Sequence, residues 1–191
     1  MLKCAKEILS EPLAIIMNAS VQMGKYPSKL KMSKIIPIYK ADDETDPNNY
    51  RPISLLSIFD IIFEKMMYKR IANFIENNNL LYNGQYGFRS AHSTQHAILD
   101  IINQIQNNME KSMFSCAVFI DLKKAFDTNS VNHSILLDKL QFYGIRGIIH
   151  EWFSSYLNGR TQTTQIGDSI SDKEKIVCGV PQGSSWDLYF S

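Results

Sequence analysis

The most informative stretch of this chain is Phe119-Ile120-Asp121-Leu122-Lys123-Lys124-Ala125-Phe126-Asp127-Thr128. The apolar run 117–120 predicts a buried strand, because a strand covered on both faces is a continuous apolar run. That strand would deliver the Asp121 carboxylate at its end. An ionised carboxylate out of water needs a counter-ion or a metal. Asp121 is therefore the first candidate for a residue that carries chemistry.

Asp121 suits an acid that holds Mg2+ at the edge of a sheet, but Asp127 is not its partner. Carboxylates that share a two-metal site hold ions about 3.5–4 Å apart. Six residues of a strand span about 20 Å, and six steps along a helix rotate by about 600°, so the two side chains would leave on different sides. Asp121 predicts half of a metal site, whose other carboxylates come from elsewhere.

Composition places the chain among globular proteins. It has 191 residues, 45% of them apolar and 20% charged, with a net charge of +1. This length suits one domain or a domain and a half, and the small net charge argues mildly against a compact nucleic-acid binder. The charge is unevenly spread, since residues 1–40 contain seven lysines and two glutamates, and the acidic stretch 42–46 follows. A solvated face explains this as well as a binding surface does.

Three features of the sequence indicate an intracellular protein, in the nucleus or the cytoplasm. The cysteines, at positions 4, 116 and 178, are odd in number and form no Cys-x-x-Cys pair, so they fit neither a disulfide framework nor a zinc site. No apolar stretch approaches the roughly 18 residues of a membrane span. The first residues contain no signal-peptide core.

Apolar spacing predicts helices mixed with separated strands, hence an α+β or α/β fold. Asn tolerates the left-handed conformation that ends a helix, and proline suits an edge strand. The expected helices are 5–23 (interrupted at Pro12), one from Ser57 (capped by Ser57-x-x-Asp60) to Asn77–Asn79, one from Ser93 to Glu110, and two short ones around 135–140 and 148–156. The expected strands are 34–40 (an edge strand, because of Pro37), 161–166 and 175–178, with 41–49 as a loop or hairpin tip.

Two further motifs accompany Asp121 in a fixed order. They are Asn49-Tyr50-Arg51-Pro52-Ile53-Ser54 and Gly179-Val180-Pro181-Gln182-Gly183-Ser184. Together the three motifs resemble the polymerase core of a LINE-like (non-LTR retrotransposon, jockey-type) reverse transcriptase. The resemblance implies an α+β right-hand polymerase with helices packed on a small mixed or antiparallel sheet. It implies fingers and an upstream helical region in residues 1–115, and a partial palm in residues 116–191.

The resemblance also implies roles for single residues. Asp121 matches the catalytic, metal-binding Asp of the first palm strand. Arg51 matches the fingers arginine that meets the triphosphate, a role that suits a planar and permanently charged fork, and Lys40 assists it. Gln182 matches the residue that contacts the incoming nucleotide. Phe126 matches the aromatic that collides with a ribose 2′-OH, although a core position explains this Phe equally well.

The resemblance places a template contact at Gly87, Phe88 and Arg89. An aromatic and basic mixture suits stacked bases and paired phosphates, but a helix-entry loop explains it as well. His133 follows Asp127 with the family's spacing, and we expect a structural role for it. The inserted pair Asn129-Ser130 departs from the family pattern.

The implied reaction is RNA-directed DNA synthesis from dNTPs, with Mg2+ as cofactor and an RNA template and DNA primer as partners. The sequence indicates no membrane partner and leaves the oligomeric state open. The family's Phe/Tyr-Ala-Asp-Asp hairpin is absent after Ser184, so the chain reads as truncated before it. The alternative hypothesis is a non-catalytic RNA- or protein-binding remnant of a mobile element.

We predict that the 191-residue chain by itself does not extend a primer, because its metal site lacks the second set of carboxylates. The measurement is primer extension on an RNA template with dNTPs and Mg2+. A robust product that disappears in Asp121→Asn would contradict the prediction.

Overall fold

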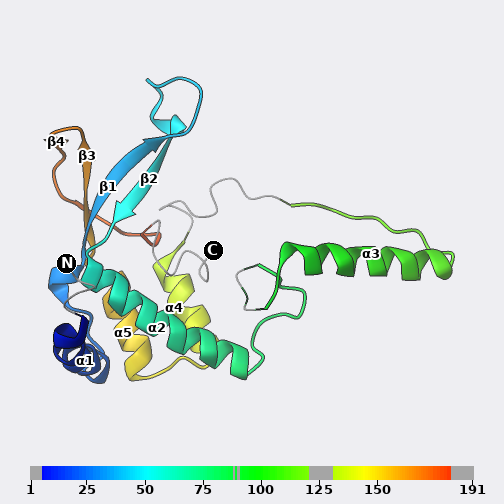
Figure 1. Ribbon diagram of the computed structural model, residues 1–191, viewed down its shortest axis with the longest axis horizontal. Coiled ribbons are helices and arrows are strands. Elements are labelled where there is room, and N and C mark those ends of the chain that lie inside the picture. The colour runs from blue at the N-terminus through cyan, green and yellow to red at the C-terminus, as the bar shows by residue number, and fades with distance from the viewer. Residues whose placement is uncertain (1–5, 88, 90, 121–130, 182–191) are drawn as a thin grey trace. The chain divides into compact units, whose positions relative to one another are not determined.

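A computed structural model describes residues 6–87, 89, 91–120 and 131–181. The chain divides into two compact units, one of Met1–Ile71 with Ala125–Ser191 and one of Ala72–Lys124. Within the described residues lie five α-helices and a five-stranded mixed sheet, which confirms the predicted α+β class. The helices are α1 (Lys6–Gln22), α2 (Ile58–Asn77), α3 (Thr94–Glu110), α4 (His133–Phe142) and α5 (Ile148–Leu157), and the strands are β1 (Met32–Tyr39), β2 (Tyr50–Leu55), β3 (Thr161–Ile166), β4 (Ser169–Ile170) and β5 (Glu174–Lys175) (Figure 1).

The sheet of the first unit has the order β2-β1-β3-β4, and β5 also pairs with β3. β1 pairs antiparallel with β2 and parallel with β3, so the predicted edge position of this strand is wrong. The register explains how Pro37 is tolerated. β3 pairs only with Met32–Ile35, and Pro37 lies opposite Pro52 of β2. At Pro37 the strand has a neighbour on one side only, as proline in a sheet requires.

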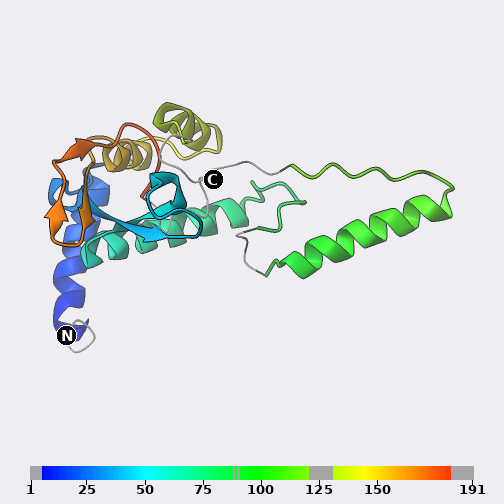
Figure 2. The ribbon, with the colours of Figure 1, turned by 90° about the horizontal axis from the view of Figure 1, so that it is seen from above.

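Helix α1 runs through Pro12, so the predicted interruption is wrong. Proline removes only the bond to the Ile8 carbonyl, and both residues are exposed, where water can replace the missing donor. Figure 2 shows this part of α1 projecting from the rest of its unit. The helix ends before Gly24, which has φ +61°, and a Cβ there would lie 3.1 Å from the Cβ of Glu151 in α5. Only glycine meets both conditions.

The predicted helix boundaries at Ser57 and Ser93 are confirmed. The Ser57 Oγ accepts a hydrogen bond of 3.1 Å from the Asp60 N–H at the start of α2. At the start of α3, the Ser93 Oγ accepts one of 3.4 Å from the His96 N–H. Both are side-chain caps that satisfy a free donor of the first turn. α2 ends at Asn77, and Asn79 takes the left-handed conformation with φ +51°.

Two predicted strands differ from the structure. Residues 117–120 form no strand, and Val118, Phe119 and Ile120 are 80%, 86% and 83% exposed. An apolar run forms a buried strand only where neighbours cover it, and the described residues supply none there. The predicted strand 175–178 is reduced to β5. The two short helices, as α4 and α5, and the strand 161–166, as β3, are confirmed. In the part of the chain that the structure describes, no helix is long and apolar enough to span a bilayer.

The core of the first unit is an aromatic cluster around Tyr26, in the segment between α1 and β1. The rings of Tyr156 and Trp152 lie with their centroids 5.0 and 5.2 Å from that of Tyr26, and the ring of Phe63 lies at 5.9 Å. All three contacts are edge-to-face, the geometry that aromatic quadrupoles prefer. The Trp152 indole N–H donates to the Ser20 Oγ at 2.9 Å. The cluster packs α1, α2 and α5 around one side chain.

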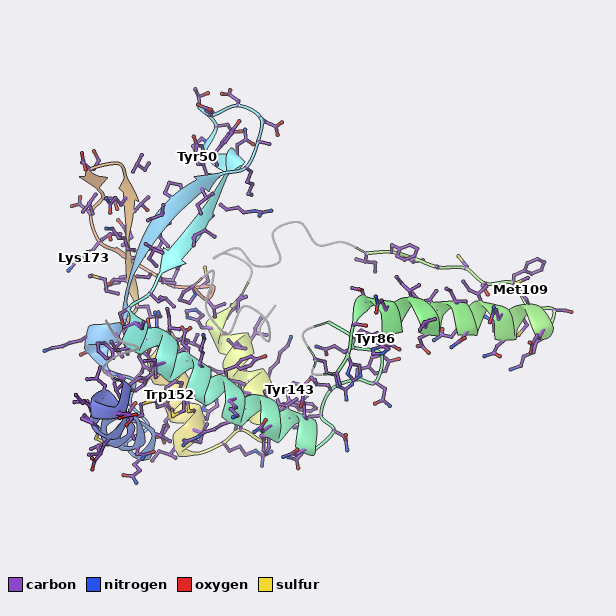
Figure 3. All side chains as sticks on the ribbon, in the orientation of Figure 1. Tyr50, Tyr86, Met109, Tyr143, Trp152 and Lys173 are labelled. Atoms are coloured by element: carbon purple, nitrogen blue, oxygen red, sulfur yellow. The ribbon has the colours of Figure 1, made fainter. Side chains whose placement is uncertain are left out.

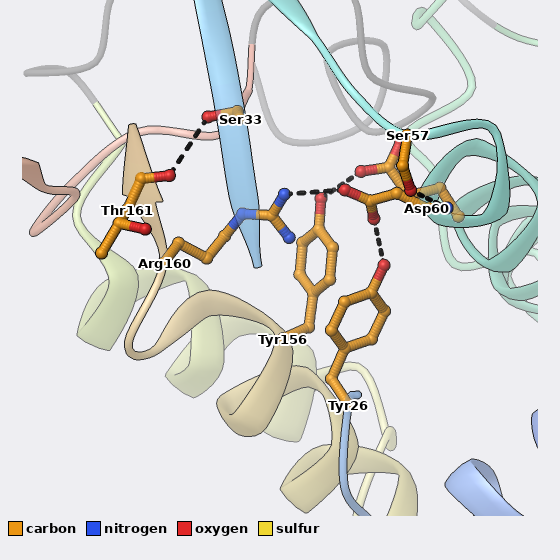
Figure 4. A network of polar contacts seen from close by, with 8 residues as sticks. Tyr26, Ser33, Ser57, Asp60, Tyr156, Arg160 and Thr161 are labelled. Carbon is orange, nitrogen blue, oxygen red and sulfur yellow. Dashed lines mark hydrogen bonds and ion pairs between the residues drawn. The ribbon is translucent and has the colours of Figure 1, made fainter. Parts of the chain in front are cut away.

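A buried polar network lies beside this cluster (Figure 4). The Arg160 Nη2 donates to the Asp60 Oδ2 at 3.0 Å, and these side chains are 1% and 0% exposed. The Tyr26 hydroxyl donates to the other Asp60 oxygen. The Tyr156 hydroxyl donates to the Glu64 Oε1 at 2.5 Å. The guanidinium carbon of Arg160 lies 4.8 Å from the centroid of the Tyr156 ring, a cation–π contact. Within the described residues, Arg160 Nε and Nη1 have no hydrogen-bond partner.

We predict that Arg160→Met lowers the free energy of unfolding by about 3–5 kcal/mol, because it leaves the Asp60 carboxylate buried without its cation. The double variant Asp60→Leu/Arg160→Met should recover part of that loss. Urea unfolding followed by circular dichroism measures the change. The control is Arg146→Met, at an exposed arginine, with an expected effect within about 0.5 kcal/mol. Equal effects of Arg160→Met and Arg146→Met would contradict the prediction.

We also predict that the fold loses stability above about pH 10, the ordinary pKa of tyrosine. Burial and the nearby carboxylates of Asp60 and Glu64 raise the pKa of Tyr26 and of Tyr156 well above that value. The folded state therefore keeps protons that the unfolded chain loses, so stability is complete below this pH and falls as pH rises. Urea midpoints from pH 8 to 11 measure the slope. Tyr26→Phe should flatten it, whereas Tyr82→Phe, at an exposed position, should leave it unchanged.

Candidate nucleotide-binding hairpin

The hairpin of β1 and β2 carries two of the predicted site residues on one face. Arg51 lies opposite Ile38 in the antiparallel register. The Lys40 N–H donates to the Asn49 carbonyl at 2.8 Å, which continues the same register by one residue beyond β1. Since side chains alternate along a strand, Lys40 shares a face with Ile38 and Arg51. Lys40 and Arg51 are both exposed, so the end of this face presents two cations to an incoming anion.

The tip of the hairpin is ordered by its own polar groups. The Tyr39 hydroxyl donates to the Asp42 carbonyl at 2.6 Å, and the Tyr50 hydroxyl donates to the Glu44 carbonyl at 2.9 Å. The two tyrosine rings pack with centroids 5.6 Å apart, and Figure 3 shows Tyr50 at the tip. Hydrogen bonds from the Thr45 backbone N–H and hydroxyl lower the pKa of Asp43. These contacts confirm the predicted hairpin tip and hold the neighbouring Lys40 and Arg51 backbones.

Below the two cations the same face is mainly apolar, apart from half-buried Lys34, which lies opposite Leu55. Ile36 lies opposite Ile53 and both are half-buried. Ile38 and Leu55, on the same face, are 53% and 48% exposed. This face therefore has cations at both ends with an apolar floor between them, and its two exposed cations, Lys40 and Arg51, lie at the tip.

The motif that begins at Gly179 lies in the same unit, and its first three residues are described. Gly179 has φ +80°, a conformation that favours glycine. Its N–H donates to the Val131 carbonyl at 2.7 Å, and its carbonyl lies 2.7 Å from the His133 Nε2. Val180 and Pro181 are buried. The predicted structural role of His133 agrees with its 9% exposure and with this bond.

Two of the predicted template residues, Gly87 and Arg89, lie in the second unit, where the loop before α3 is tied to that helix. The Tyr86 hydroxyl donates to the Asp100 Oδ2 at 2.8 Å, and this bond raises the pKa of Tyr86. Gly87 is exposed, and a Cβ there would meet nothing within 4 Å. Arg89 is half-buried and its carbonyl accepts a hydrogen bond from the His92 N–H at 3.3 Å.

Four predicted site residues, Asp121, Phe126, Gln182 and Phe88, lie outside the described residues, so their roles stay predictions. The carboxylate of Asp121 is a hard oxygen donor of the kind that Mg2+ prefers, but it supplies one ligand. Among residues 6–87, 89, 91–120 and 131–181, no three His, Cys, Asp or Glu side chains gather as metal ligands do.

Comparison with known proteins identifies the family. The sequence profile of reverse transcriptase (RNA-dependent DNA polymerase) matches residues 38–186. The chain therefore belongs to the reverse transcriptase family, as the three motifs predicted.

The relatives are proteins of mobile elements. The chain is 32% identical over 179 residues to a probable RNA-directed DNA polymerase from transposon BS of Drosophila melanogaster, covering 90% of this chain and 19% of that protein. It is 31% identical, with the same shares, to the RNA-directed DNA polymerase from mobile element jockey of that species. A retrovirus-related Pol polyprotein from type-1 retrotransposable element R2 of Popillia japonica is 29% identical over 161 residues, 84% of this chain and 22% of that protein. These relatives confirm the predicted resemblance to jockey-type, non-LTR elements. The chain spans about a fifth of their length.

Sequence reasoning missed the buried network. Asp60 and Glu64 were available signals, because they lie on the same helical stripe as Phe63, Met67 and Ile71, all of which are buried. Two carboxylates within an apolar stripe predict buried partners. No sequence signal identified Arg160 as that partner, 100 residues further along the chain.

Proposed function

We propose that this chain forms the fingers and the first part of the palm of a retrotransposon reverse transcriptase, and that the β1–β2 hairpin binds the triphosphate of the incoming dNTP. The supporting observation is the placement of Lys40 and Arg51 on one exposed face at the end of an ordered hairpin. A guanidinium fork and an ammonium can share the oxygens of a triphosphate. In this proposal the fingers and their upstream helices comprise residues 1–115, and the partial palm comprises residues 116–191.

The other site residues have proposed roles in the family's reaction, in which an RNA template directs DNA synthesis from a primer. Gln182 contacts the nucleotide, and Phe126 disfavours a ribose 2′-OH. Asp121 would supply one ligand to a Mg2+ ion, and the bound ion would stabilise negative charge on the phosphate oxygens. Gly87 to Arg89 meet the template through stacking and phosphate contacts. These roles follow from the family's motifs at matching positions.

We predict that Arg51→Ala weakens binding of dTTP in the presence of Mg2+ by about tenfold or more, because it removes a charge-assisted contact to phosphate. Isothermal titration of the purified chain measures the affinity. The matched control is Arg70→Ala, which removes an exposed arginine from α2, outside the hairpin. Equal affinities of the Arg51 and Arg70 variants would refute the proposed triphosphate site.

A second candidate function is a binding module without catalysis, and the second unit favours it. No residue of α3 is buried. Its apolar stripe is open, with Ile98 57%, Ile101 44%, Ile102 43%, Ile105 39% and Met109 70% exposed, and exposed apolar surface of this kind marks interaction sites. Salt-dependent RNA binding without any dTTP binding would favour this function over the first.

A further inference from the structure

The segment that leads into α4 satisfies both backbone groups of Gly179. The Val131 carbonyl accepts from the Gly179 N–H at 2.7 Å. The Gly179 carbonyl can only accept, so the His133 Nε2, also at 2.7 Å, carries the proton in this bond. Val131 and His133 are each 9% exposed and Val180 is 4% exposed. Water has little access to this contact, and the two bonds fix the peptide planes on both sides of Gly179.

His133 is itself held in place. It is the first residue of α4, whose N-cap Asn132 accepts from the Ser134 N–H at 2.9 Å and from the Ile135 N–H at 3.4 Å. Leu136, one turn further along, is buried. A capped helix with a buried face provides a rigid base. The His133 imidazole, which belongs to this helix, therefore holds the Gly179 carbonyl at a fixed position relative to α4.

We propose that His133 is a positioning residue for nucleotide binding, which acts by fixing Gly179–Pro181. Pro181 directly precedes Gln182 in the sequence, and Gln182 itself lies outside the described residues. This inference rests on the proposed function, in which Gln182 contacts the nucleotide. His133 does not touch the substrate.

A purely structural histidine would lower stability without a particular effect on this loop. His150 provides the matched control, because its Nε2 lies 3.2 Å from the Leu137 carbonyl and so makes the same type of bond between α5 and α4. The test uses four variants of the full chain. His133→Phe keeps a ring and removes the donor, His133→Gln restores an N–H of similar reach, His150→Phe breaks the control bond, and Gln182→Ala removes the proposed nucleotide contact.

Two measurements are made on each variant. Amide hydrogen exchange by NMR reports on the Gly179 and Val180 N–H groups, and titration with dTTP and Mg2+ reports the affinity. His133→Phe removes the bond to the Gly179 carbonyl, so the loop should open more easily. We expect the Gly179 N–H, which bonds to the Val131 carbonyl, to exchange about tenfold faster, the factor that corresponds to one buried hydrogen bond. We also expect dTTP binding to weaken as much as it does in Gln182→Ala. His133→Gln should restore most of both. His150→Phe should change neither.

The outcomes separate this inference from the function on which it rests. Unchanged Gly179 exchange in His133→Phe, or equal changes in His133→Phe and His150→Phe, overturns the positioning role. If Gln182→Ala weakens dTTP binding while His133→Phe does not, the link to the nucleotide is overturned. If Gln182→Ala does not change dTTP binding, the role of Gln182 in the proposed function is refuted, and so is the link between His133 and the nucleotide. Hydrogen exchange at Gly179 still reports whether His133 holds the loop.

A variant that fails to fold does not end the test. In the unsubstituted chain, the imidazole 15N spectrum distinguishes the two neutral tautomers of His133. A proton on Nε2 with slow exchange is expected, and a proton on Nδ1 alone would overturn the bond.

Discussion

The ion pair between Arg160 and Asp60 is the interaction on which the first unit depends. A buried charge is tolerated only beside its partner, because desolvation costs several kcal/mol per ion, so neither residue can leave the core alone. Tyr26 adds a third chain segment by donating to the same carboxylate. Arg160 directly precedes β3, Asp60 lies in the first turn of α2, and Tyr26 lies six residues before β1. These two contacts therefore join the segments that lead into both central strands, β1 and β3, to the first turn of α2.

These contacts give the proposed nucleotide-binding hairpin a fixed base. β1 begins beside the network, pairs with β3 over its first four residues, and then continues with β2 alone to the tip that carries Lys40 and Arg51. The Gly179 loop is fixed at a second place, by α4. Rigid elements with short functional ends are a common arrangement for binding sites. Here the ends carry cations, an apolar floor and a glycine turn.

Local signals predicted the local structure well. Ser57 and Ser93 begin their helices, Asn79 ends one, and residues 161–166 form the expected strand. The failures come from context. Pro12 lies on an exposed face of α1, where the missing N–H donor matters little. Pro37 lies in the part of β1 that pairs with β2 alone, beyond the residues that pair with β3. The apolar run 117–120 is exposed, because burial depends on what packs against a strand and not on the strand's own composition.

The sequence by itself determined the family, the order of its motifs and the residue types that suit phosphate and metal. Those properties can be read from short stretches, because each motif is a run of particular residue types at a fixed spacing. Only the tertiary structure decided that Lys40 and Arg51 share a face, that Asp60 meets Arg160 across 100 residues, and that His133 holds Gly179 across 46. Strand register and the partners of buried polar groups depend on segments far apart in the chain, and they become fixed only when the whole core packs.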